Sequence, residues 1–281
     1  LSVTATGSIT DDGDGQAAGD DINVAGVTSL TATGEFGDIL LNDIFNNFES
    51  DAGAGEPTDN VNATATSLTL TDIDAISLGD IDLSGDLRVR AGGSIVDNGT
   101  GTGDGDSIDV VGATSLVAES SFDDDIVLDN ALNDFGSTVT ASGVDITLVD
   151  KNSIQLGDID ALGTLSVTAT GSITDDGDGQ AAGDDINVAG VTSLTATGEF
   201  GDILLDDEFN DFDSDAQASP TEPVIASGNN ITLNDVDAII LGSIQADGSV
   251  TVTTASSVEL ESSAQIQATN ADVTFGLDGS D

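Results

Sequence analysis

An identical internal duplication is the sequence feature that most constrains the fold. Residues 1–41, "LSVTATGSITDDGDGQAAGDDINVAGVTSLTATGEFGDILL", return without a change at 165–205. A diverged copy begins at Leu87, and a truncated copy begins at Val250. The sequence therefore predicts an array of repeats, each roughly 78–86 residues long when complete, at 1–86, 87–164, 165–249 and 250–281.

Short segments inside each repeat alternate apolar and polar residues. Leu1 and Val3 face one side of an extended segment, and Ser2 and Thr4 face the other, as in a strand with one buried face. Related segments recur roughly every 20–30 residues, a spacing that suits one coil of a β-solenoid and predicts about four coils per repeat. No window shows sustained helical periodicity, so we expect an all-β fold in which 1–281 form one continuous solenoid with parallel strands.

Tandem immunoglobulin-like β-sandwich domains are the alternative fold, because such domains also repeat every 80–100 residues or so. Each domain needs about seven strands, and usually a large aromatic centre. The chain has no Trp and no Tyr, and its Phe residues are clustered. These observations favour the β-solenoid.

The charge of the chain limits its partners. The net charge is −50, with three basic residues in 281. Such a surface repels nucleic acid and anionic membranes, and no apolar run approaches the 18 residues of a membrane span, so we expect neither partner. His and Cys are absent and carboxylates are too abundant for any pair to indicate catalysis, so we expect no enzyme activity.

The loop "DDGDGQAAGDD" is a candidate calcium site, because alternating Asp and Gly supply hard oxygen ligands on a bendable backbone. The alternative interpretation is a solvated corner of the solenoid, since Asp and Gly are also common turn residues. Calcium is the possible cofactor, and the candidate ligands are Asp11, Asp12, Asp14, Asp20 and Asp21 in the first copy and Asp175, Asp176, Asp178, Asp184 and Asp185 in the second.

Three further features have local interpretations. Arg88 and Arg90 lie on the outward face of one expected strand, where we interpret them as offsetting neighbouring Asp. Phe45 and Phe48, with Phe209 and Phe212 in the second copy, lie beside excursions of variable length and are expected to cap the core beneath them. The excursions themselves, 49–59 and 213–223, are expected on the surface.

The patterns "LxVxAxGSI", "DILLxDxFNDF" and "SGxxITLxDxxxIxLGxI" give the chain a family resemblance. They are carried, for example, by 202–212 and 227–244. This combination resembles the repeats of filamentous-haemagglutinin-like bacterial exoproteins and adhesins. The resemblance implies a right-handed parallel β-helix, export across the bacterial envelope and an extracellular or cell-surface location.

Together these features predict an extracellular structural segment of a bacterial surface fibre or filament. The expected partners are further repeats of the same chain or other copies of it, stacked end to end. The alternative is an adhesive module that binds a receptor or glycan through the two excursions. Calcium stiffening is compatible with both functions.

Overall fold

The computed structural model describes residues 1–11, 21–48, 59–97, 107–119, 124–176, 185–214 and 221–277. All the regular secondary structure in these ranges is β-strand. None of the described residues belongs to a helix long and apolar enough to cross a membrane. The chain divides into two compact units, Leu1–Val144 and Asp145–Asp281.

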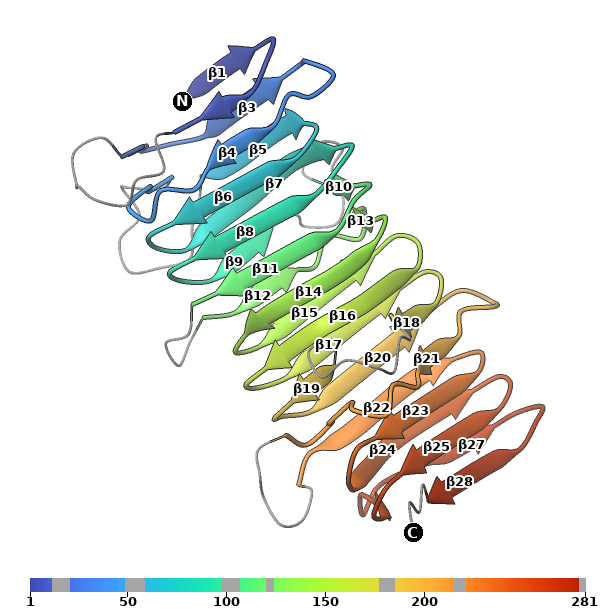
Figure 1. Ribbon diagram of the computed structural model, residues 1–281. Coiled ribbons are helices and arrows are strands. Elements are labelled where there is room, and N and C mark those ends of the chain that lie inside the picture. Colours follow the sequence, from blue (N-terminus) through green and yellow to red (C-terminus); the bar gives the residue numbers. More distant parts are fainter. Residues whose placement is uncertain are drawn as a thin grey trace. The chain divides into compact units, whose positions relative to one another are not determined.

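The N-terminal unit consists of two sheets whose strands pair in parallel (Figure 1). In spatial order, sheet A of this unit contains β1 (Ser2–Ala5), β3 (Thr28–Ala32), β5 (Asn60–Ala65), β7 (Ile76–Leu83), β9 (Ile95–Asp97) and β12 (Ile126–Leu128), and β10 (Ile108–Val110) pairs with β7 and β13 (Asp134–Phe135). Sheet B contains β2 (Ile9–Thr10), β4 (Ile39–Leu41), β6 (Leu68–Asp72), β8 (Leu87–Ala91), β11 (Thr114–Ala118) and β14 (Thr138–Gly143). Apart from the short strands β10 and β13, which add to sheet A, successive strands alternate between the sheets, so each coil contributes to both.

The C-terminal unit repeats this arrangement. Its sheet A contains β15 (Ile146–Asp150), β17 (Leu165–Ala169), β20 (Thr192–Ala196), β22 (Pro223–Gly228), β24 (Ile239–Ala246) and β26 (Val258–Leu260), and β27 (Ile266–Ala268) also pairs with β24. Its sheet B contains β16 (Ile154–Ala161), β18 (Ile173–Asp175), β21 (Ile203–Leu205), β23 (Ile231–Asp235), β25 (Val250–Thr254) and β28 (Val273–Leu277), and β19 (Ile186–Val188) pairs with β16.

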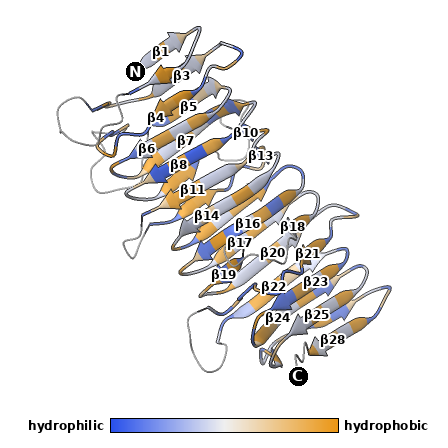
Figure 2. Cartoon of the chain, in the orientation of Figure 1, coloured by the Kyte–Doolittle hydropathy of each residue, from blue (hydrophilic) through white to orange (hydrophobic). Residues whose placement is uncertain are grey.

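The period-2 pattern of the sequence explains how each coil buries one face. In β17 and β20, buried and partly exposed residues alternate strictly, because successive side chains of a strand point to opposite faces. Leu194 of β20 pairs with Val167 of β17 and with Ala226 of β22, so apolar side chains stack in columns inside the coils. Figure 2 shows the same alternation as orange and pale positions along the strands.

Counted over the described residues, repeats 1 and 3 each contain three and a half coils. Repeat 1 holds β1 to β7, so β1 begins it in sheet A while β8 begins repeat 2 in sheet B. In the C-terminal unit, β17 and β25 begin repeats 3 and 4 in sheets A and B in the same way. The described coils are thus slightly fewer than the roughly four expected per repeat, and the equivalent first strands of repeats 1 and 2, and of repeats 3 and 4, lie in opposite sheets.

The predicted parallel β-solenoid is confirmed, and the immunoglobulin-like alternative is wrong because the described strands pair in parallel rather than antiparallel. Of the predicted caps, Phe48 and Phe212 are 1% exposed, whereas Phe45 is half-buried and Phe209 is 38% exposed, so the prediction holds for one phenylalanine of each pair. Phe36 and Phe200, by contrast, are 78% and 76% exposed. The continuity of the solenoid over 1–281 stays a prediction.

Candidate functional site

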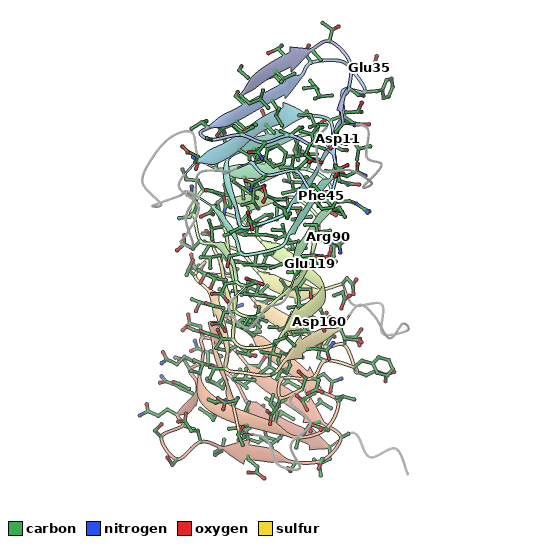
Figure 3. All side chains as sticks on the ribbon, turned by 90° about the vertical axis from the view of Figure 1, so that its left-hand side faces the viewer. Asp11, Glu35, Phe45, Arg90, Glu119 and Asp160 are labelled. Atoms are coloured by element: carbon green, nitrogen blue, oxygen red, sulfur yellow. The ribbon has the colours of Figure 1, made fainter. Side chains whose placement is uncertain are left out.

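A corner built from one aspartate and one asparagine recurs in the first three repeats. Within each pair, the aspartate lies at or just after the end of a short strand, and the asparagine lies in the turn of the following coil. We call these the Asp–Asn corners, formed by Asp11 with Asn46, Asp97 with Asn133, and Asp175 with Asn210. Figure 3 labels Asp11 and also Phe45, the residue that precedes Asn46 in the sequence.

The hydrogen bonds of the Asp–Asn corner in repeat 3 show how it joins consecutive coils. The Asp175 Oδ2 atom accepts hydrogen bonds from the backbone N–H of Asp207 at 3.0 Å and from the Asn210 Nδ2 group at 3.1 Å. The Asn210 Oδ1 atom accepts the N–H of Ile186 at 3.0 Å. The carbonyl of Asn210 accepts the N–H of Val236, in the next coil, at 2.7 Å. One buried asparagine therefore ties three coils together.

The other two corners reproduce this geometry. Asn46 Nδ2 donates to Asp11 Oδ2 at 2.8 Å, and Asn133 Nδ2 donates to Asp97 Oδ2 at 2.7 Å. All three asparagines are fully buried, so their polar groups depend on these partners rather than on water. Burial raises the pKa of Asp175, although the hydrogen bonds from Asp207 and Asn210 oppose the shift.

The structure gives part of the predicted calcium loops a structural role. Asp11 and Asp175 form Asp–Asn corners, so one oxygen of each already accepts two hydrogen bonds. Asp21, Asp176 and Asp185 lie at the loop ends within the described residues, but no group of three acids forms around them there. The remaining candidates, Asp12, Asp14, Asp20, Asp178 and Asp184, lie outside the described residues. Calcium binding by these loops stays a prediction.

A different acidic group comes together in repeat 3. One carboxylate oxygen from each of Asp211, Asp235 and Asp237 lies within 4.8 Å of the other two. Asp235 is 2% exposed, and its two oxygens accept the N–H groups of Phe212 and Asp237, each at 3.0 Å. Burial raises the pKa of Asp235 to about 6, and the charges of Asp237 and Asp211 add to the effect. Three such carboxylates can share a proton or contribute oxygens to a hard cation.

Comparison with repeat 1 shows what is particular to this acidic triad. The aligned residues there are Asn47, Asp72 and Asp74, and the Asn47 Nδ2 group donates to Asp74 Oδ2 at 2.9 Å. In repeat 2 the aligned residues are Asp134, Asp150 and Asn152, again with one amide. Repeat 3 alone has three acids at these positions. Sequence reasoning missed the triad, but aligning "FNDF" and "DVDA" with the other repeats would have revealed the lost amide.

The two predicted binding excursions give no further site. Residues 49–58 and 215–220 lie outside the described residues. At the described edge of the second excursion, Asp213 Oδ2 accepts the N–H of Thr221 at 2.9 Å, which closes that loop at its base. Adhesion through the excursions stays a prediction.

The stacked coils and their recurring Asp–Asn corners define a β-solenoid repeat protein. Residues 1–54, 65–142 and 143–219 match a family described as "Repeats of unknown function (DUF5649)". These matches cover most of the chain, which therefore belongs to that family. No curated protein and no solved structure matches the chain. The family supports the repeat character, and the finer resemblance to filamentous-haemagglutinin-like repeats stays a prediction.

Proposed function

We propose that this chain is a structural, non-catalytic segment of an extracellular bacterial fibre, in which β-solenoid coils stack end to end. One comparison carries the proposal. Residues 165–175 are identical to residues 1–11, and β15 and β16 lie on them through parallel pairing with β17 and β18. There Leu165, Val167 and Ile173 are fully buried.

The same eleven residues at 1–11 present this face to solvent. Leu1 is 47% exposed, and Val3 and Ile9 are half-buried. Because the sequence is the same, the difference comes from the coil that covers 165–175. The first coil thus carries a face that fits a further coil, whether that coil comes from more repeats or from another copy.

The last described coil has a matching apolar face. Val273, Phe275 and Leu277 of β28 are 39%, 49% and 67% exposed, and β28 pairs with β25 along one edge. β28 lies in sheet B, whereas β1 lies in sheet A. A copy stacked on this coil therefore begins in the sheet that comes next in the alternation.

The acidity of the chain sets the conditions for this stacking. A net charge of −50 makes copies repel one another at distances beyond contact, and salt shortens that range to about 8 Å at physiological ionic strength. Apolar burial at the coil faces then exceeds the repulsion. The extracellular and bacterial setting rests on the resemblance of the repeats to exported exoproteins.

Electron microscopy and light scattering of the purified chain at increasing NaCl test this proposal. We expect filaments, and we expect Val3→Asp and Phe275→Asp to abolish them because each places a charge on a stacking face. Ser2→Asp is the matched control, since Ser2 faces outward on the same strand and its variant should still assemble. A chain that stays monomeric up to 1 M-scale NaCl, or a Val3→Asp variant that assembles normally, contradicts the proposal.

A further inference from the structure

Two of the three basic residues of the chain lie side by side in a hollow on the outer face of sheet B of the N-terminal unit. Arg88 and Arg90 alternate with the buried Leu87, Val89 and Ala91 of β8, so both point outward. The hollow has a volume of about 290 Å³ and is lined by these arginines together with Thr69, Ser115, Ile44 and Val117, among others. We call it the arginine hollow.

Strand pairing fixes the neighbours of each arginine. Arg88 pairs with Thr69 of β6 and Ser115 of β11, so a hydroxyl flanks it on either side. Arg90 pairs with Thr71 and Val117. The apolar part of the lining includes Ile44, which is 49% exposed, and Val117, which is 36% exposed. Cationic, hydroxyl and apolar groups thus converge in one small concavity.

The two arginines differ in their partners. Arg90 forms an ion pair with Glu119, and Figure 3 shows the two residues on the same side of the unit. Within the described part of the chain, no carboxylate lies within ion-pair distance of the Arg88 guanidinium. Arg90 therefore pairs with a glutamate rather than with one of the aspartates expected, and among the described residues Arg88 pairs with no acid.

The repeat itself does not require arginine at these positions. The strands equivalent to β8 carry Ser2 and Thr4 in β1, Ser166 and Thr168 in β17, and Thr251 and Thr253 in β25. Hydroxyl side chains therefore satisfy the outer face of this strand elsewhere. The arginines of β8 depart from that pattern at the place where the surface is hollowed.

We propose that the arginine hollow binds an acidic saccharide unit, with its carboxylate on Arg88. A guanidinium presents a planar fork of N–H donors that matches the two oxygens of a carboxylate. Thr69 and Ser115 can exchange hydrogen bonds with ring hydroxyls, and Ile44 and Val117 can contact the C–H face of the ring. This binding site is independent of the stacking faces of the proposed fibre.

Calorimetric titration of the full chain with digalacturonate tests the proposal at physiological ionic strength. Neutral digalactose is the ligand control. We expect saturable binding of the acidic saccharide only, and Arg88→Gln to weaken it about tenfold through loss of a charge-assisted contact. Lys151→Gln removes the same charge elsewhere and should change the affinity less than about twofold. Both variants are expected to keep the wild-type melting temperature.

Three results overturn the proposal. The first is equal affinity for the acidic and neutral saccharides, and the second is equal weakening by Arg88→Gln and Lys151→Gln. The third is the absence of saturable digalacturonate binding. If Arg88→Gln then also changes self-association by analytical ultracentrifugation, the occupant of the hollow is an acidic segment of a second copy.

Discussion

Replacing Asp211 by Asn should stabilise the chain at neutral pH by restoring the amide that repeat 1 carries. Asn47, at the aligned position, donates to Asp74 at 2.9 Å, whereas Asp211 places a third carboxylate within 4.8 Å of Asp235 and Asp237. The substitution Asp211→Asn therefore removes a like-charge contact and adds a donor. The Asp211 Oδ1 atom accepts the N–H of Asp213 at 3.2 Å, and the amide oxygen of Asn can accept the same hydrogen bond.

The magnitude follows from the separation of the charges. Two like charges 4.8 Å apart repel by about 1 kcal/mol in water and about 3.5 kcal/mol at an effective dielectric constant of 20. Asp211 is half-buried and Asp237 is exposed, so solvent screening favours the lower part of that range. We expect a gain of about 1–2 kcal/mol, or roughly 3–6 °C in melting temperature.

The gain should depend on pH because the pKa of Asp235 is raised to about 6 from its ordinary 3.8. As pH rises, the unfolded chain loses this proton first, so folding becomes less favourable between about pH 4 and pH 6. The stability that protonated Asp235 contributes is fully present below its ordinary pKa of 3.8. It is lost as the pH rises through about 6, the pKa of Asp235 in the folded chain. Asp211→Asn should flatten this decline and have little effect at pH 4.

Thermal melting from pH 4 to pH 7, with a chelator at fixed ionic strength, measures the effect without bound divalent cations. Asn47→Asp is the matched reverse variant, and it should lower the melting temperature at pH 7 by a similar amount while leaving it unchanged at pH 4. If Asp211→Asn gives no increase at pH 7, or the same increase at every pH, repulsion within the acidic triad is not the cause.

Three further predictions, two of them with a matched second substitution, test the packing and the corners by thermal or urea unfolding. Leu165→Ala should lower the free energy of unfolding by about 2–4 kcal/mol, because Leu165 is 0% exposed. Leu1→Ala, in the identical local sequence, should lower it by under about 1 kcal/mol, because Leu1 is 47% exposed. Equal losses would contradict the stacking account. Thr192→Val should raise stability by about 1 kcal/mol, since its Oγ1 atom is buried without a hydrogen-bond partner among the described residues, whereas the outward Thr195→Val should change little. Asn210→Ala should cost about 3 kcal/mol, because it removes one of the two donors to Asp175 and the acceptor of the Ile186 N–H. A loss below about 1 kcal/mol would refute the structural role of the Asp–Asn corner.

The strands and their buried faces could be predicted because they are encoded locally. The alternation of Leu165, Val167 and Ala169 with polar residues determines which side chains point inward, and the stacking of similar strands follows from the repeat. The number of coils could not be predicted in this way. Two short strands, β18 and β19, occupy successive parts of one long neighbour, β16, and so count as one position in the coil.

The role of Asp11 was harder to predict because its partner Asn46 lies 35 residues away. Nothing local distinguishes Asp11 from the other acids of "DDGDG", so the sequence predicted a metal ligand there but not the hydrogen bond to Asn46. The acidic triad has the same long-range character, since Asp211 and Asp235 come from adjacent coils. An alignment of the repeats nevertheless shows that Asp211 stands where repeat 1 has the amide side chain of Asn47.

Cryo-electron microscopy of the assembled chain tests the central claim most directly. If coils stack end to end, β-strand rungs should continue across the junction between copies at the ~4.8 Å spacing of paired strands, with Leu1 and Val3 buried against the coil that contains β28. A break in the rungs at the junction, or copies joined through their outer faces, would contradict the account.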